Sequence, residues 1–174
     1  MPGHSWVMID RIQADSGKRS VLLVDDDRFI REIGGLAVRQ IGFEALEASS
    51  LPEAMNILTA HGRISLVISD VQMPGGSGIE LLNRMKLDET WSSIPFALMT
   101  GGPLSDLPTG VLVLCKPFLP LQIQCVVVAN LGGMCPKAAR CSGVKKIGPC
   151  DPERCNIYVN EWSPTVQLRS SEAG

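Results

Sequence analysis

Four short, largely apolar runs, each closed by a polar side chain, form the most regular pattern in this chain of 174 residues. The runs occupy positions 21–24, 66–69, 96–99 and 111–115, and the polar residues that close them are Asp25, Asp70, Thr100 and Lys116. Short continuous apolar runs of this kind are typical of strands that are buried on both faces. The pattern therefore predicts a sheet that is covered on both sides.

Between these runs, apolar residues recur at helical spacing. We expect helices after Asp27, after Ser50, over 79–87 and over 119–131, with a further strand over 43–48. Strands that alternate with helices predict an α/β fold with a doubly wound, five-stranded parallel sheet. Because the carboxyl ends of parallel strands meet at one edge of the sheet, the polar residues that close the runs are expected to lie close together.

The residue types at this edge suit phosphoryl chemistry. Asp25, Asp26 and Asp70 would repel one another, and a divalent cation relieves such a cluster. Mg²⁺ is bound in proteins by one or two carboxylates together with water and phosphate oxygens. An aspartate can act as a nucleophile and form an aspartyl-phosphate. Lys116 would supply positive charge and Thr100 a hydrogen-bond donor for the phosphoryl oxygens.

This ordered set of residues resembles the receiver domain of bacterial response regulators. The resemblance spans residues 20–131 and rests on Asp25-Asp26, on Asp70 with Met73-Pro74 and Gly78, on Thr100, and on Lys116-Pro117-Phe118. Each motif alone is weak, but their order and their positions at strand ends are specific together. The resemblance implies a flavodoxin-like receiver fold.

The same resemblance implies a role for each residue of the site. Asp70 would take a phosphoryl group from a histidine kinase or a histidine phosphotransfer protein. Mg²⁺ would be held by Asp25, Asp26, Asp70 and the backbone carbonyl of Gln72. Thr100 and Lys116 would contact the phosphoryl oxygens, and the Lys116–Pro117 peptide bond would be cis. Asp27, just beyond the acidic pair, is expected to be a solvated loop residue instead.

Two features depart from the family pattern. Residues 101–110 contain two prolines and three glycines, which argue against the helix that the family has between its last two strands. We therefore expect a shortened or missing fourth helix. The family also commonly places an aromatic residue three positions before the lysine, where this chain has Val113. Both departures concern the surface through which most receivers signal.

Composition and charge divide the chain into three parts, a leader (1–19), the receiver (20–131) and a tail (132–174). A hydrophobic fraction of 45% with 20% charged residues is that of a globular chain, and no apolar run is long enough to span a bilayer. The leader lacks the apolar core of a signal peptide, so a cytoplasmic location is expected. The receiver is acidic and the tail only weakly basic, which predicts no nucleic-acid binding.

The tail contains four of the six cysteines, Cys135, Cys141, Cys150 and Cys155. Four thiolates can form a zinc site, but the spacing within the first pair is longer than in common zinc knuckles. A loosely ordered tail with free thiols is the favoured interpretation, and bound metal is the alternative. Cys115 and Cys125, within the receiver, are expected to be buried apolar residues.

The sequence leaves alternatives to a phospho-accepting receiver in a phosphorelay. The first is a pseudo-receiver that acts as a binding scaffold without phosphorylation. The second is a metal- or redox-sensing adaptor that uses the cysteine tail. A phosphatase with the same acid cluster would need a second aspartate two residues after Asp70, where this chain has Gln72. We therefore expect no enzymatic turnover beyond gain and loss of the protein's own phosphoryl group, while the partner kinase and the oligomeric state stay open.

Overall fold

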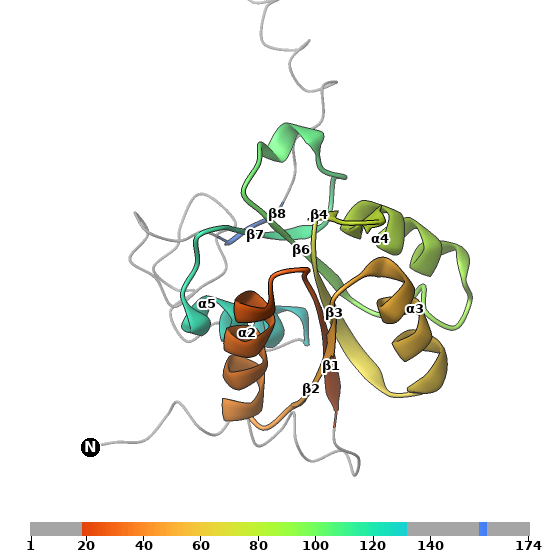
Figure 1. Cartoon of the computed structure of the whole chain (residues 1–174), viewed down its shortest axis with the longest axis horizontal. Helices are drawn as coiled ribbons and strands as arrows, with labels where there is room; N and C mark the ends of the chain where they lie inside the picture. The colour runs from red at the N-terminus through yellow and green to blue at the C-terminus, as the bar shows by residue number, and fades with distance from the viewer. Residues whose placement is uncertain (1–18, 132–156, 160–174) are drawn as a thin grey trace, which may run out of the picture.

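The computed structural model describes residues 19–131 and 157–159, and within them it has the expected α/β architecture (Figure 1). Five strands lie parallel in the order β2-β1-β3-β6-β7. They are β1 (Ser20–Val24), β2 (Glu44–Ala48), β3 (Ile64–Asp70), β6 (Phe96–Thr100) and β7 (Leu112–Cys115). The predicted doubly wound, five-stranded parallel sheet is thus confirmed.

Four helices cover the two faces of this sheet. They are α2 (Arg28–Gln40), α3 (Leu51–Ala60), α4 (Gly78–Leu87) and α5 (Pro120–Asn130). Figure 1 shows α2 and α5 on one face and α3 and α4 on the other. Among residues 19–131, no helix is both long and apolar enough to cross a membrane.

The apolar runs are nearly continuous because each of their strands contributes to two cores. Val21 and Leu23 of β1 belong to the core under α2 and α5, while Leu22 and Val24 belong to the core under α3 and α4. Successive side chains of a strand point to opposite faces, so a strand covered on both sides is apolar at nearly every position. The buried Ser69 of β3 is an exception whose hydroxyl donates to the Asp70 carbonyl. This burial holds the strand ends, and the polar residues that follow them, in fixed positions.

The connection from β6 to β7 lacks a regular α-helix, as the prolines and glycines predicted. Residues 101–111 contain one three-residue 3₁₀ turn, η1 (Leu104–Asp106). Leu107 and Val111 nonetheless bury their side chains in the core under α3 and α4. The connection therefore covers the sheet with loop residues where a helix was expected to be shortened or absent.

A sixth strand was not foreseen from the sequence. Residues Ile157–Val159 form β8, which pairs antiparallel with β7 and extends the sheet beyond its last parallel strand. This strand belongs to the segment that was predicted to be a separate tail. Cys135, Cys141, Cys150 and Cys155 lie outside the described residues, as does most of the leader.

Candidate phosphoryl-acceptor site

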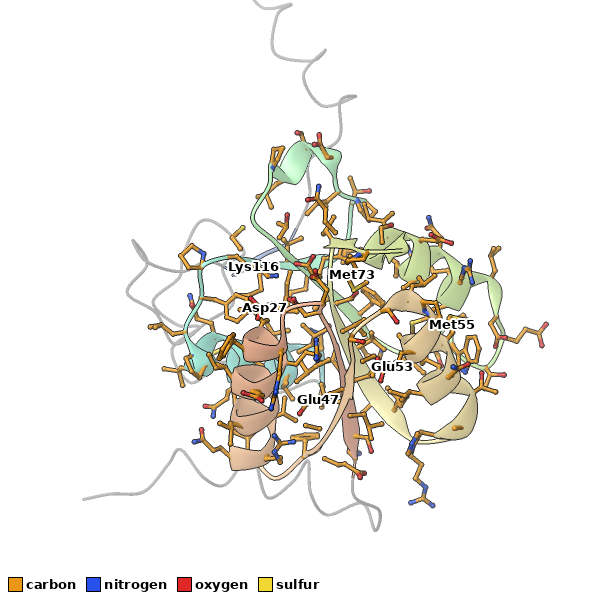
Figure 2. All side chains as sticks on the ribbon, viewed as in Figure 1. Asp27, Glu47, Glu53, Met55, Met73 and Lys116 are labelled. Atoms are coloured by element: carbon orange, nitrogen blue, oxygen red, sulfur yellow. The ribbon has the colours of Figure 1, made fainter. Side chains whose placement is uncertain are left out.

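The carboxyl edge of the parallel sheet brings three of the predicted site residues into direct contact. The Lys116 Nζ atom lies 2.7 Å from Asp25 Oδ2 and 2.5 Å from Asp70 Oδ1. Asp25 directly follows β1, Asp70 ends β3, and Lys116 directly follows β7. Figure 2 places Lys116 at this end of the sheet, near the start of α2. Residues that are far apart in sequence thus form one cluster because their strands are parallel neighbours or near neighbours.

Asp25 is the most deeply buried of these charged groups, with 1% of its side chain exposed. Its Oδ1 atom accepts a hydrogen bond from the Asp27 backbone N–H at 2.9 Å, and its Oδ2 atom accepts one from Lys116. Burial nevertheless raises the pKa of Asp25 above its ordinary value, because loss of water outweighs the hydrogen bonds from Lys116 and Asp27. The charged form of this carboxylate is therefore costly in the absence of further positive charge.

Lys116 balances two opposing effects. Burial alone would favour the neutral amine, but the hydrogen bonds to Asp25 and Asp70 outweigh it and raise the pKa of Lys116. The side chain is therefore a fixed ammonium group across the physiological range. The expected cis peptide bond between Lys116 and Pro117 is present directly after it.

Asp70 contributes the second carboxylate of the cluster, and this carboxylate is more exposed than that of Asp25. Its Oδ2 atom accepts a hydrogen bond from the Gln72 backbone N–H at 2.7 Å, while Lys116 contacts the other oxygen. The residue is buried, with only 7% of its surface exposed, and its backbone carbonyl accepts a hydrogen bond from the Ser69 hydroxyl at 2.9 Å. Both carboxylate oxygens therefore have a fixed orientation.

The segment after Asp70 is shaped by a tight hairpin. Strands β4 (Gln72–Met73) and β5 (Gly76–Ser77) pair antiparallel, leaving Pro74 and Gly75 at the turn. The φ angle of Gly75 is +77°, which suits the second central position of a type II turn, with proline at the first. The Met73-Pro74 motif thus sets the course of the chain after Asp70.

The next glycine has a different structural role. A Cβ atom on Gly78 would lie 2.2 Å from the backbone oxygen of Asp70, so α4 can begin here only with glycine. The Gly78 N–H also donates to the Val71 carbonyl at 3.1 Å. Gly78 therefore sets how closely α4 approaches Asp70.

Thr100 ends β6 at the same edge, and its side chain is buried. Its Oγ1 atom accepts a hydrogen bond from the Gly102 N–H at 2.9 Å, which orients the hydroxyl. Its backbone carbonyl accepts from the Lys116 N–H at 2.7 Å and so joins β6 to β7 at the site. Gly101 and Gly102 are exposed beside it. Thr100 is thus placed at the edge as predicted, with an open path for water next to it.

Asp26 and Asp27 differ from the buried acids. Asp26 is exposed, and its backbone carbonyl accepts a hydrogen bond from the Arg31 Nη1 atom at 3.0 Å. Asp27 is exposed as expected, but it also caps α2, because its Oδ1 atom accepts from the Phe29 N–H at 2.8 Å. An aspartate just before a helical pattern is a signal for such a cap, so the capping role of Asp27 could have been predicted from the sequence.

Arg31 was also missed. Its Nη1 atom donates to the backbone oxygens of Asp25 and Asp26 at 2.6 and 3.0 Å. These bonds hold the loop that carries both acids against the first turn of α2. The sequence contains no local signal for this contact, since an arginine near a helix start is common on solvated surfaces.

The donor set at this edge fits a hard divalent cation. Asp25, Asp26 and Asp70 with Lys116 leave two negative charges, and every donor other than the ammonium is an oxygen atom. Within residues 19–131, no three His, Cys, Asp or Glu side chains form a ready-made metal cage. Mg²⁺ does not require one, because it is commonly held by one or two carboxylates and several waters. The exposed Asp26 and the raised pKa of Asp25 both favour added positive charge here.

Comparison with known proteins points to one family. Residues 21–107 match the model described as the response regulator receiver domain. The phosphate regulon transcriptional regulatory protein PhoB of Pseudomonas aeruginosa is 33% identical over 141 residues, which cover 78% of this chain and 56% of that protein. The chain spans about half the length of the curated relatives that it matches.

Solved structures agree with these sequence matches. The receiver domain of the hybrid histidine kinase CckA is 31% identical, with a TM-score of 0.55, covering 64% of this chain and 98% of that one. A response regulator receiver protein from Pseudomonas putida is 28% identical, with a TM-score of 0.52, covering 59% of this chain and 88% of that one. The shared part is the α/β domain that carries the acidic site.

Proposed function

The chain belongs to the response-regulator receiver family, and from this premise we propose that Asp70 is its phosphoryl acceptor in two-component signalling. The contact of Lys116 with both Asp25 and Asp70 is the observation that carries the proposal. The positive charge of Lys116 beside Asp70 supports the proposal, because the phosphoryl oxygens would develop negative charge there.

In the proposed reaction, one Asp70 carboxylate oxygen forms a bond to phosphorus. The bond from phosphorus to the imidazole nitrogen of a donor histidine breaks, and the electron pair stays on that nitrogen. Lys116 shifts toward the phosphoryl oxygens and keeps its proton, which its raised pKa supports. The Thr100 hydroxyl donates a hydrogen bond to another phosphoryl oxygen and keeps its proton. Asp25 and Asp26, with the Gln72 carbonyl, would hold Mg²⁺, which would neutralise charge on the transferring group.

An apolar surface beside the site supports a protein partner as the phosphoryl donor. Phe29, Ile33 and Leu36 follow one face of α2 at helical spacing and are 72%, 40% and 58% exposed. Leu119 and Leu121, at the start of α5, are exposed as well. Apolar side chains gathered beside a reactive site mark a protein contact. A histidine kinase or a histidine phosphotransfer protein would dock on this surface. Such a partner is consistent with the predicted cytoplasmic location, which stays a prediction.

Intact mass after incubation with Mg²⁺ and acetyl phosphate tests the proposal. We expect a labile gain of one phosphoryl group that is absent without Mg²⁺ and absent from Asp70→Asn. Because acetyl phosphate is small, Phe29→Ser should keep this reaction and lose transfer from a phosphorylated histidine phosphotransfer protein. A gain that persists in Asp70→Asn would assign the phosphoryl group to another residue.

The pseudo-receiver is the second candidate, and the missing helix between β6 and β7 favours it. Val113 is fully buried in the core under α3 and α4, so it does not act as a switching aromatic side chain at the surface. The same experiment separates the two candidates. No mass gain with a folded protein and saturating Mg²⁺ would support a scaffold that works without phosphorylation.

A further inference from the structure

The outer edge of β7 is covered by a strand from the same chain. Leu112 lies opposite Val159, Val113 opposite Tyr158 and Leu114 opposite Ile157 in an antiparallel pairing. Figure 1 shows β8 alongside β7, at the margin of the sheet away from β2. Without β8, this margin would end in a strand with one unpaired side.

The direction of the backbone groups identifies which residue of β7 holds β8. The Lys116 N–H donates to the Thr100 carbonyl, so the backbone groups of Lys116 face β6. Backbone groups alternate sides along a strand, which directs those of Leu114 toward β6 and those of Val113 toward β8. Val113 and Tyr158 are therefore the pair that exchanges both backbone hydrogen bonds.

Nothing in the paired part of β7 would repel an incoming strand. Sheet edges are usually protected by lysine, proline, bulges or a covering helix. The paired residues of β7 are Leu112, Val113 and Leu114, and the connection before them contains only the short turn η1. An apolar edge of this kind is a template for strand addition, a common mode of peptide recognition.

We propose that the outer edge of β7 is a strand-binding site whose resident occupant is the chain's own segment Ile157–Val159. A protein that binds this receiver by strand addition has to displace that segment first. The pairing covers three residues, with one fully hydrogen-bonded pair, so it is short enough to be reversible. The paired residues of β7 precede Lys116, which contacts Asp25 and Asp70, so the strand that holds β8 leads into the acidic cluster.

The chain itself favours this occupant over a second copy. Ile157 is joined to the end of α5 through residues 131–156, a length that easily spans the width of a small domain. A tethered segment meets its binding site at a much higher effective concentration than a free copy of the same segment does. A second copy reaches such concentrations only in very concentrated samples.

Amide hydrogen exchange on the full-length protein tests the proposal. Tyr158→Pro removes the backbone N–H that would donate a hydrogen bond to the Val113 carbonyl. Tyr158→Ala keeps this N–H and serves as the matched control. We expect the Val113 amide to exchange at least tenfold faster in Tyr158→Pro than in Tyr158→Ala. The amides of Leu112 and Leu114 face β6 and should keep their wild-type rates in both variants.

Two results would overturn the proposal. One is a Val113 amide that exchanges in wild-type protein as fast as an unstructured amide, or equally slowly in both variants. The other is a dimer in light scattering whose dissociation exposes Val113, because the strand would then come from a second copy. A monomeric wild-type protein with a protected Val113 amide, lost only in the proline variant, supports the chain's own segment as the occupant.

Discussion

Replacing Lys116 with methionine is the sharpest test of the electrostatics in the acidic cluster. Methionine keeps much of the side-chain volume but removes the ammonium that contacts Asp25 and Asp70. Asp25 is then left buried and ionised without a charged partner. Removing one partner of a buried ion pair commonly costs about 3–5 kcal/mol.

The loss of unfolding free energy in Lys116→Met should fall below that range, at about 2–3 kcal/mol, because water has access to part of the cluster. The Lys116 side chain is 25% exposed and that of Asp70 is 9% exposed, so solvent can replace some of the lost contact. Asp25, at 1% exposed, has no such relief and should account for most of the loss. Its pKa, already raised by burial, should rise further in the variant.

The pH dependence has a defined sign. When the pKa of a carboxyl group is raised in the folded state, the folded protein loses stability as pH increases through that raised pKa. The free-energy gap between wild type and Lys116→Met should therefore shrink toward acid pH, where Asp25 is protonated. Lys116 contributes stability below its unfolded pKa of 10.5, and this is lost as pH rises through its raised folded pKa. The gap should thus be largest near neutral pH.

Urea unfolding, followed by far-ultraviolet circular dichroism in EDTA at several pH values, measures this gap. The double variant Lys116→Met/Asp25→Asn is the control, and it should recover most of the lost stability because Asp25, the most deeply buried carboxylate, is then uncharged. A gap below about 0.5 kcal/mol at pH 7 would refute the reasoning, since it is the value of an exposed pair. A gap that is constant with pH would refute it as well.

Three further substitutions test separate parts of the site. Asp27→Ala should cost about 1 kcal/mol in urea unfolding through loss of the α2 cap, whereas Asp27→Asn should cost little; equal losses would contradict the capping role. Gly78→Ala should lower the melting temperature sharply and reduce acetyl phosphate labelling, because the new Cβ would meet the backbone oxygen of Asp70. Gly62→Ala is the control and should be nearly neutral, because its Cβ would meet nothing within 4 Å. Gly102→Glu should slow loss of the phosphoryl group by shielding it from water, measured by intact mass over time, and more than Gly101→Glu does; equal lifetimes would place the water path elsewhere.

The fold was predictable because its strongest signal lies in continuous apolar runs. In β3, Leu66 and Ile68 face one core and Val67 faces the other. Burial on both sides therefore requires consecutive apolar residues, and this pattern can be recognised in the sequence. The place of the site followed from the same signal, since strand ends such as Asp70 must lie at the shared edge. A parallel arrangement then brings distant residues together without any further information.

Other features could not be predicted from such patterns. The bridge that Lys116 forms between two acids depends on side-chain geometry that no periodicity encodes. The contact of Arg31 with two carbonyls depends on where the loop turns after β1. Strand β8 has three residues, too few for a recognisable pattern, and it pairs where it does because β7 offers a free edge. These features arise from tertiary contacts and not from local preference.

The cluster of Asp25, Asp70 and Lys116 includes a buried carboxylate whose ionisation is unfavourable. The pKa of Asp25 is raised even with an ammonium 2.7 Å away, which means that burial costs more than the ion pair returns. Natural sites that conflict with stability in this way usually serve a function. Positive charge added at this edge would lower the cost of the buried carboxylate and stabilise the folded state. Because Lys116 directly follows β7, any change in its partners acts at the end of the strand that also holds β8. The acidic cluster at the carboxyl end of the sheet and the outer edge of β7 that pairs with β8 are therefore joined through one short segment, from Leu112 to Lys116.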